Sequence, residues 1–580
     1  MGCFKLVQKY LSANTDPAAQ GASQAAWIHR LSSPLPGSAQ GPLAGLSFAV
    51  KDNIDVAGLP TTAGCPAFSH AVSASAVVVQ RLLQAGACLQ GKTNMDQFAC
   101  GLNGTRSPYG AVPNAFDSRY ISGGSSAGSA YVVASGEVDF ALGTDTAGSG
   151  RVPAGLNNIV GLKPSRGLIS TRGVLPAAQS VDVVSIFARS VPMAWRVLAA
   201  AAAHDAHDPY SRSLALQTAP FPKSLRFGVP RELEFFGDEQ SQAQFELAVQ
   251  RMQSLGGQAV PFDYAPFAQA AALLYDSALV AERYAAIRDF FDANEEQVIE
   301  PVRSIIAQGR TYSAADVFEA QLKLKALAQQ LEPVWSQFDC MMVPTAPTHY
   351  TIAQMQSDPV VLNRRLGAYT NFVNLLDYAA LSVPSSVRAD GLPFGITLIG
   401  PCGSDWALAE LGQRYHHASG LSLGATGHSL GSIEPLPAPP PDERQARIQV
   451  AVVGAHLSGM PLNWQLTERA GRCLRAAHTS PDYRLFALPG TVPPKPGLLR
   501  VAPGQGAAIA LEIWDMPVAH YGSFVALIPA PLGIGSVSLD DGSQVQGFLC
   551  ESQALTDAKD ITHLGGWRAY MREHLAAGQA

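Results

Sequence analysis

The sequence predicts an α/β protein that continues into a smaller α+β domain. Short apolar runs, among them LSFAV, DFALG, CMMVP and GITLIG, alternate with helical patterns over most of the first 435 residues. Residues 436–445 are rich in proline, which removes backbone donors and stiffens the chain, so we expect a linker there. After it, RIQVAVVGAHLSG opens a new strand-and-turn pattern. We therefore expect one domain at residues 1–435 and a second at residues 446–580.

The helical patterns of the first domain can be placed along the chain. Residues 1 to about 40 predict a helical lead-in. A helix is expected from Gln240 to Leu255, because apolar side chains recur on one face at Phe245, Ala248, Met252 and Leu255. A second long helix is expected from about Ala314 to Phe338. Apolar stripes of this kind usually pack against a core.

Composition and charge exclude several classes of protein. The chain has 580 residues, of which 40 are basic and 46 acidic, so its formal net charge is −6. A surface that binds nucleic acid or an anionic membrane needs an excess of basic residues, so neither partner is expected. Hydrophobic residues make up 47% of the chain and charged residues 15%, which excludes disorder as its main state.

Several features predict a soluble cytoplasmic protein. The cysteines are scattered without a CxxC pair, so we expect neither a disulfide framework nor a cysteine zinc site. The start, MGCFKLVQKY, lacks the apolar core of a signal peptide, and Leu6 stands where N-myristoylation requires Ser or Thr. The longest apolar stretch, around residues 197–203, is too short to span a bilayer.

One motif matches the phosphate-binding loop GxxxxGK[ST] letter for letter, from Gly86 to Thr93. That motif requires a strand before it and a helix that begins at its lysine. Here the preceding SAVVVQRLLQAG predicts a helix, and residues 88–92 predict a strand. Because this context is inverted, a nucleotide-binding ATPase is kept only as an alternative.

A second motif, Gly124 to Gly128, matches the nucleophile elbow GxSxG with Ser126 at its centre. An elbow requires an apolar strand just before the serine and a helix after it. The helix is plausible in SAYVVASG, but the preceding DSRYISGG is turn-like. The α/β-hydrolase interpretation is therefore disfavoured.

A third pattern combines Lys51 with two Gly/Ser-rich turns. Lys51 lies in AVKDNIDVAG just after an apolar strand, and the turns span residues 121–130 and 143–154. Ser125 follows Lys51 by 74 residues, and Ser149 follows Ser125 by 24. Attack on an amide carbonyl needs an activated hydroxyl and donors for the oxyanion. No histidine lies near either turn in the sequence, so the available base is the lysine, which must be kept neutral by burial.

This ordered set resembles the amidase signature family over most of residues 40–430, including GKTNMDQFA, GLKPSRG and GLPFGITLIG. The resemblance implies a mixed central sheet flanked by helices. It implies Ser149 as the nucleophile, Lys51 as the general base and Ser125 as a bridge whose peptide bond is cis. The implied oxyanion hole consists of the backbone N–H groups of Thr146, Ala147, Gly148 and Ser149.

The second turn departs from the commoner family pattern DTGGSIR. It reads DTAGSGR, with Ala147 in place of a glycine and Gly150 in place of a bulky residue. This variant resembles the allophanate hydrolase branch of the family, and so do NNIVGLKPSRG, LYDSALVAERY and GAYTNFVNLLDYAAL. In the tail, VAVVGAHLSGMPLN and ALIPAPLGIG resemble the C-terminal domain of that branch, which has a gamma-glutamyl-cyclotransferase-like fold.

Allophanate is small and carries a carboxylate beside its scissile amide, so a site for it needs a cation and hydroxyl donors. The resemblance implies that Tyr275 and Arg283 hold this carboxylate, with Gly124 as a further binding residue. Their spacing of eight places Tyr275 and Arg283 on about the same face of a helix. Taken alone, these residues are more typical of a core tyrosine and a surface arginine paired with Glu282.

In the C-terminal domain, His456 and Asn463 follow the first expected strand and are polar candidates. The resemblance implies that this domain takes part in decarboxylating the first product. For His456, a structural role with satisfied hydrogen bonds is an equally good interpretation.

The implied reaction needs no cofactor and no metal ion. Hydrolysis releases ammonia, and the N-carboxycarbamate product decarboxylates to ammonia and carbon dioxide. The chain has no biotin-carrier motif, so a separate urea carboxylase, or a biuret or triazine pathway, must supply allophanate. Relatives are dimers, so a homodimer is expected. The alternatives are a general small-amide amidase of the same family and a non-catalytic scaffold with the amidase fold.

Overall fold

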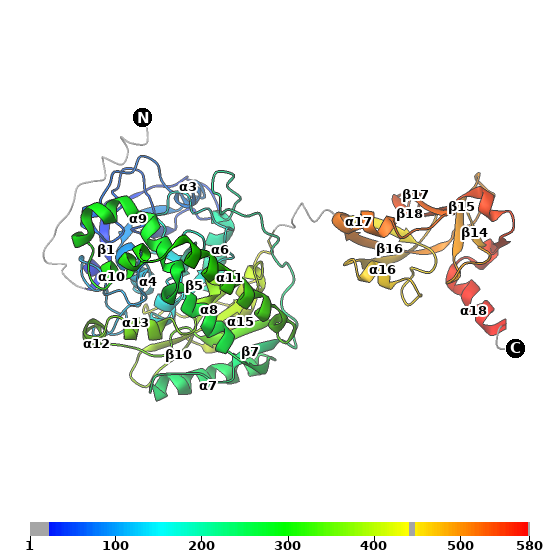
Figure 1. Ribbon diagram of the computed structural model, residues 1–580. Helices are drawn as coiled ribbons and strands as arrows, with labels where there is room; N and C mark the ends of the chain where they lie inside the picture. Colours follow the sequence, from blue (N-terminus) through cyan, green and yellow to red (C-terminus); the bar gives the residue numbers. More distant parts are fainter. Residues whose placement is uncertain (1–21, 440–446, 578–580) are drawn as a thin grey trace. The chain divides into compact units, whose positions relative to one another are not determined.

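The computed structural model describes residues 22–439 and 447–577 (Figure 1). The chain divides into two compact units, residues 1–440 and 441–580. The division falls within the expected linker, whose residues 440–445 lie outside the described part of the chain. Among the described residues, no helix combines the length and the hydrophobicity that crossing a bilayer requires.

The first unit is built on an eleven-stranded mixed sheet in the order β1-β3-β2-β4-β6-β5-β10-β11-β9-β7-β8. The neighbours β3, β2 and β4 are parallel, as are β9, β7 and β8, whereas the strands between these groups pair antiparallel. The strands are β1 (Trp27–Leu35), β2 (Ser47–Lys51), β3 (Cys88–Thr93), β4 (Phe140–Asp145), β5 (Val160–Lys163), β6 (Val183–Ala188), β7 (Arg226–Pro230), β8 (Gln258–Phe262), β9 (Cys340–Pro344), β10 (Ala379–Val387) and β11 (Pro393–Gly400).

Helices cover both faces of this sheet (Figure 1). Because successive strand residues point to opposite faces, Phe48 and Val50 pack in one core with Trp195 of α6, while Ala49 packs in another with Ala130 of α4. The helices are α2 (Ala22–Ala25), α3 (Val77–Gln84), α4 (Ala127–Ala134), α5 (Val152–Leu156), α6 (Val191–Ala201), α7 (Glu239–Ser254), α8 (Ala265–Asp276), α9 (Ala281–Asn294), α10 (Val302–Ala307), α11 (Ala314–Leu331), α12 (Ile352–Ser357), α13 (Val361–Leu366), α14 (Phe372–Leu375) and α15 (Asp405–Ser419).

Both long helices expected from the sequence are confirmed. The first is α7, and its buried residues include Phe245, Ala248 and Met252 from the expected apolar stripe. The second is α11, which starts at Ala314 behind a capping box made by Ser313 and Asp316. It continues beyond Leu331 as a 3-10 turn over Glu332–Ser336.

Of the described residues before position 40, only the short helix α2 fits the expected helical lead-in, and the rest of that expectation is wrong. Trp27–Leu35 forms β1, which pairs antiparallel with β3 at the edge of the sheet. Backbone pairing with an already formed neighbour outweighs the weak local helix preference of this segment. The remainder of the expected lead-in, residues 1–21, lies outside the described part of the chain.

The structure gives the phosphate-loop match a different role. The helix α3 precedes β3, and Lys92 lies within that strand, so the strand-loop-helix order of the motif is absent here. The Lys92 ammonium is fully buried and lies 3.2 Å from the Asp52 carboxylate. The elbow interpretation, which the sequence disfavoured, lacks its strand, because residues 124–126 form bends directly before α4.

The second unit contains a five-stranded sheet in the order β13-β16-β12-β18-β17 and a three-stranded sheet in the order β15-β14-β19. Its own apolar core includes Val450, Ile513 and Trp567. The elements are β12 (Arg447–Val452), α16 (Trp464–Thr467), β13 (Arg472–His478), β14 (Tyr483–Ala487), β15 (Pro496–Arg500), β16 (Ala510–Pro517), α17 (Val518–Val525), β17 (Leu532–Ser538), β18 (Gln544–Cys550), β19 (Lys559–Asp560) and α18 (Trp567–Ala577).

Candidate active site

Lys51 is the last residue of β2, and its side chain is fully buried. The parallel register with β4 places Val50 opposite Leu142, so the ends of the two strands lie together. The Lys51 Nζ atom lies 2.7 Å from Ser125 Oγ and 2.8 Å from Thr144 Oγ1. The amine is therefore held between two hydroxyl groups at one end of the sheet.

The surroundings of Lys51 favour its neutral form. Burial lowers its pKa to about 7, because a charged amine loses its hydration. The carboxylates of Asp96, Asp182 and Asp145 oppose this shift, and the Arg283 guanidinium adds to it. A large fraction of this lysine is thus available as a base near neutral pH.

Ser125 and Ser149 continue the chain of polar contacts from Lys51. Their Oγ atoms lie 2.9 Å apart, and both side chains are buried. The Gly124–Ser125 peptide bond is cis. The Ser149 hydroxyl also lies 3.4 Å from the carbonyl oxygen of Gly101. The structure therefore brings together the lysine and the two serines that the sequence singles out.

The turn that carries Ser149 is held by a buried ion pair. One Asp145 carboxylate oxygen accepts from Gly148 N–H and the other from Gly150 N–H, each at 2.9 Å. The same carboxylate accepts from the Arg151 guanidinium at 2.9 Å. Asn374 donates to the carbonyl oxygen of Asp145 at 2.7 Å and accepts from Arg151. These contacts fix the backbone of the turn from both sides.

The expected oxyanion donors differ in their availability. The Gly148 N–H group already donates to Asp145, so it is not available as an oxyanion donor. Within the described part of the chain, the backbone N–H groups of Thr146, Ala147 and Ser149 have no hydrogen-bond acceptor. Gly148 instead allows a close approach, because a Cβ atom there would lie 2.4 Å from Thr370 Oγ1.

Tyr275 and Arg283 meet, although they do not share a helix as the sequence predicted. Tyr275 lies near the end of α8, and Arg283 lies in the first turn of α9. Ser277 ends α8 in extended conformation and caps the short 3-10 turn that follows, which breaks the helix between them. The Arg283 Nη2 atom donates to Tyr275 Oη at 3.1 Å.

The Arg283 guanidinium is buried, with 4% of the residue exposed. Its Nε and Nη1 groups have no hydrogen-bond acceptor among the described residues. The suggested surface pair with Glu282 is absent, because that carboxylate accepts from Ser180 N–H and Oγ instead. A buried guanidinium with unused donors is suited to bind a carboxylate.

Gly124 lies against the loop that follows β3. A Cβ atom at this position would lie 2.2 Å from Asp96 Oδ2 and 2.6 Å from Gly104 N. Asp96 itself accepts from the backbone N–H groups of Asn103 and Gly104. Glycine is therefore required here for the backbone to reach its position beside Ser125.

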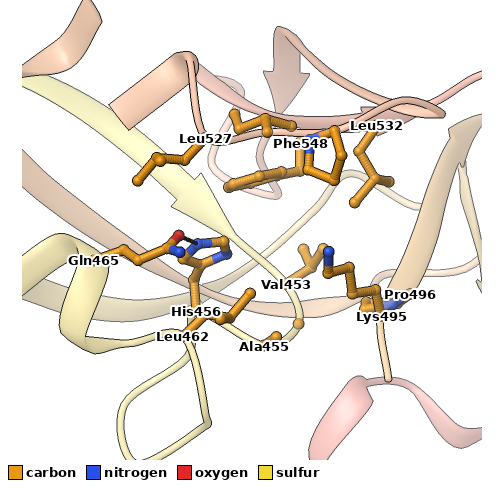
Figure 2. A pocket seen from close by; sticks show the side chains of 13 residues that line it. Val453, Ala455, His456, Leu462, Gln465, Lys495, Pro496, Leu527, Leu532 and Phe548 are labelled. Atoms are coloured by element: carbon orange, nitrogen blue, oxygen red, sulfur yellow. Dashed lines mark hydrogen bonds between the residues drawn. The ribbon is translucent and has the colours of Figure 1, made fainter. Parts of the chain in front are cut away.

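The second unit contains a separate pocket that is lined by His456. Figure 2 shows the His456 and Lys495 side chains facing this pocket, with Leu527, Phe548 and Leu532 across from them. The His456 ring stacks on Phe548 with centroids 5.0 Å apart, and its Nε2 lies 2.8 Å from Gln465 Oε1. Burial lowers the pKa of His456, which favours the neutral ring.

Asn463 has a different place from the one expected. Its amide donates to the carbonyl oxygen of His456 at 2.9 Å, so it supports the loop instead of lining the pocket. Gln465 and Lys495 line the pocket, although the sequence did not single them out. In the first unit the sequence likewise missed Thr144, whose hydroxyl contacts Lys51. The only available signal for Thr144 was its place in the same GTDTAGSG run as Ser149.

Comparison with known proteins gives the relationships of both units. The sequence profile of the amidase family matches residues 5–408, and that of the allophanate hydrolase C-terminal domain matches residues 448–572. Urea amidolyase of Saccharomyces cerevisiae is 44% identical over 541 residues, which are 91% of this chain and 30% of that protein. The chain thus spans about 30% of the length of this curated relative.

Solved structures agree with this assignment. The fold is similar to that of Kluyveromyces lactis allophanate hydrolase, with a TM-score of 0.74 and 41% identity over 99% of this chain and 97% of that one. The K. lactis urea amidolyase matches with a TM-score of 0.73 and 41% identity, over 99% of this chain and 36% of that one. The expected mixed sheet flanked by helices is confirmed, and the chain belongs to the amidase family, with an allophanate hydrolase C-terminal domain in its second unit.

Proposed function

We propose that this chain is an allophanate hydrolase that cleaves the terminal amide of its substrate. One observation carries the proposal: the Arg283 guanidinium lies close enough to Lys51 of the buried Lys51–Ser125–Ser149 chain to lower its pKa, and among the described residues its Nε and Nη1 groups have no acceptor. The first feature suits attack on an amide, and the second suits a substrate that carries a carboxylate. The names of the related proteins support the same assignment.

In the proposed mechanism, neutral Lys51 takes the proton of Ser125 while Ser125 takes that of Ser149. The Ser149 oxygen bonds to the amide carbon, and the carbonyl oxygen becomes an oxyanion. The N–H groups of Thr146, Ala147 and Ser149 are the proposed donors to it. The C–N bond then breaks, and ammonia leaves with the proton returned through Ser125. Water hydrolyses the acyl-enzyme by the same proton path.

Arg283 and Tyr275 are the proposed ligands of the substrate carboxylate. The Nε and Nη1 groups of Arg283 supply two donors, and the Tyr275 hydroxyl lies beside them. Gly124 keeps its proposed place as a backbone wall of the substrate site. The remaining product, N-carboxycarbamate, passes to decarboxylation, for which we propose the His456 pocket of the second unit.

We further propose that the chain works in the cytoplasm as a homodimer, and that a separate urea carboxylase, or a biuret or triazine pathway, supplies its substrate. The unpaired thiols of Cys65, Cys100, Cys340 and Cys550 suit a reducing compartment. The urea amidolyases that match this chain are longer proteins, which leaves room for a carboxylase part that this chain does not match. Sedimentation velocity on the purified chain tests the dimer.

Replacing Ser149 or Lys51 with alanine is expected to lower ammonia release from allophanate at least about a thousandfold, because each removes a member of the proton chain. Ser126→Ala is the matched control, since the Ser126 hydroxyl contacts the Thr144 carbonyl oxygen and lies outside that chain. Steady-state kinetics with coupled ammonia detection make the measurement. Near-normal turnover by either alanine variant contradicts the mechanism.

The reactivity of Ser149 is expected to rise with pH through a midpoint near 7. The pKa of Lys51 is lowered to about 7, so its basic form is lost as pH falls through that value. Labelling by a serine-directed fluorophosphonate, followed from pH 5 to 9, measures the midpoint without any substrate. A rate that stays constant over this range in the wild type, or labelling of the Lys51→Ala variant at the wild-type rate, excludes the lysine as base.

Replacing Arg283 with leucine is expected to lower kcat/KM for allophanate by roughly 10- to 100-fold, mainly through KM, because a charge-assisted pair is lost. The matched control is Arg288→Leu on the exposed side of α9. A neutral amide of similar size is expected to lose far less. An equal loss on both substrates would refute carboxylate recognition by this residue.

The second unit is expected to speed release of the second ammonia and to leave the first unaffected. The test compares the 1–440 fragment, the His456→Ala variant and the full chain by following ammonia release from allophanate over time. His478→Ala, an exposed histidine on β13, is the control. If the His456→Ala variant releases the second equivalent at the wild-type rate, the pocket has no part in decarboxylation.

A further inference from the structure

We propose that the segment Ala177–Asp182 is a brace that fixes the distance between the oxyanion turn and Arg283, and that it thereby limits the length of the substrate. This inference rests on the proposed function, because it assigns the two ends of the substrate to those two places. It makes Asp182, Ser180 and Glu282 positioning residues rather than catalytic ones.

One end of the brace holds the turn that carries Ser149. The Thr146 hydroxyl donates to Asp182 Oδ1. The other carboxylate oxygen of Asp182 accepts from the backbone N–H groups of Ala177 at 2.7 Å and Ala178 at 3.1 Å, which closes the segment on itself. Asp182 is buried, so these bonds are shielded from water. The first proposed oxyanion donor is thus tied to this segment by its own side chain.

Packing and a second polar bridge strengthen the same end. Ala147 shares an apolar cluster with Ala178 and Val181, and Tyr275 packs against that cluster. The Asn374 amide donates to the carbonyl oxygens of both Asp145 and Val181, at 2.7 and 3.0 Å. The segment therefore cannot shift without moving the turn or losing several buried contacts.

The other end of the brace holds the start of α9. Ser180 N–H and Ser180 Oγ donate to the two carboxylate oxygens of Glu282, each at 2.7 Å. Glu282 directly precedes Arg283 in the chain, so this pair of bonds fixes the backbone that carries the guanidinium. The carbonyl oxygen of Ser180 accepts from the Arg166 guanidinium at 2.8 Å, so Arg166 anchors the middle of the segment as well.

The charge of Asp182 adds to this positioning. Burial raises its pKa to about 6, and the Arg283 guanidinium opposes that shift, so the carboxylate is ionised at neutral pH. It attracts Arg283 from one side and favours protonation of Lys51 from the other. Asp145 and Asp96 act on Lys51 in the same direction, so loss of Asp182 leaves part of that field in place.

A fixed separation has a chemical consequence. A substrate held by its carboxylate at Arg283 presents its carbonyl carbon to Ser149 only if the two groups are the right distance apart. Allophanate and malonamate place one atom between carboxylate and amide carbon, whereas succinamate places two. Since misplacement by about 1 Å can cost on the order of 100-fold in rate, a rigid brace discriminates strongly between them.

The experiment compares malonamate and succinamate as substrates of the full chain. Glu282→Ala frees the Arg283 end of the brace, and Ser180→Ala weakens the same link. Asp289→Ala is the matched control, because it removes an exposed carboxylate from the same helix. Fluorophosphonate labelling of Ser149 reports folding and an intact proton chain in each variant, because none of the three substitutions changes Lys51, Ser125 or Ser149.

Glu282→Ala is expected to lower kcat/KM for malonamate roughly tenfold, mainly through KM, and to lower that for succinamate far less. The selectivity ratio should therefore fall at least about fivefold, while Asp289→Ala leaves it unchanged. The double variant that combines Glu282→Ala with Ser180→Ala should have the same selectivity ratio as Glu282→Ala alone. The reason is that both substitutions break the same link between Ser180 and Glu282.

Asp182→Asn tests the other end of the brace. It is expected to lower kcat on both substrates, and to move the pH midpoint of labelling below that of the wild type, since a negative charge near Lys51 is removed. A purely structural defect would lower the labelled fraction without moving the midpoint.

Two results overturn the brace. One is an unchanged ratio of malonamate to succinamate in Glu282→Ala, and the other is an unchanged kcat on both substrates in Asp182→Asn. Failure of the proposed function would be distinct, because the wild type would then hydrolyse neither allophanate nor malonamate.

Discussion

The site depends on one constraint: an amine must stay uncharged while it is surrounded by carboxylates. Burial of Lys51 at the end of β2 disfavours its ammonium form, and Asp96, Asp182 and Asp145 pull in the opposite direction. The result is a pKa of about 7, which suits a base at neutral pH. Such burial requires a thick layer of protein on both faces of the sheet, and the eleven-stranded sheet with its two helical layers supplies it.

The turn that carries Ser149, the proposed nucleophile, is held in a different way. Asp145 and Arg151 are both fully buried and form an ion pair at 2.9 Å. A buried pair of this kind adds little net stability, because desolvation offsets its attraction. Its value lies in geometry, since the Asp145 carboxylate also collects Gly148 N–H and Gly150 N–H and so fixes the turn. The N–H groups of Thr146, Ala147 and Ser149 are the proposed oxyanion donors, and preorganised dipoles contribute most to catalysis where negative charge develops.

The sequence alone predicted the fold class and the residues whose positions depend on strand ends and turns. Lys51 follows an apolar run, and Ser149 lies in a Gly/Ser-rich turn after another, so parallel strands bring them together. It did not predict that Ser277 ends α8, because the break is made by one side chain capping a short 3-10 turn. The sequence also did not predict the role of Asp182, because its carboxylate accepts from residues up to 36 positions away and no local pattern marks these contacts. Long-range pairing also determines the conformation of β1, which pairs with β3 at the edge of the sheet where a helix was expected.

In the proposed function, selectivity for an anion depends on the burial of Arg283. Among the described residues, the Nε and Nη1 groups of this buried guanidinium have no hydrogen-bond acceptor, and a buried donor without a partner costs free energy. A substrate carboxylate removes that cost on binding, whereas a neutral amide leaves it in place. Tyr275 accepts from the Nη2 group, so Nε and Nη1 are the donors proposed for the substrate. In this proposal Arg283 carries the discrimination, and Ser125 and Ser149 need not distinguish one small amide from another.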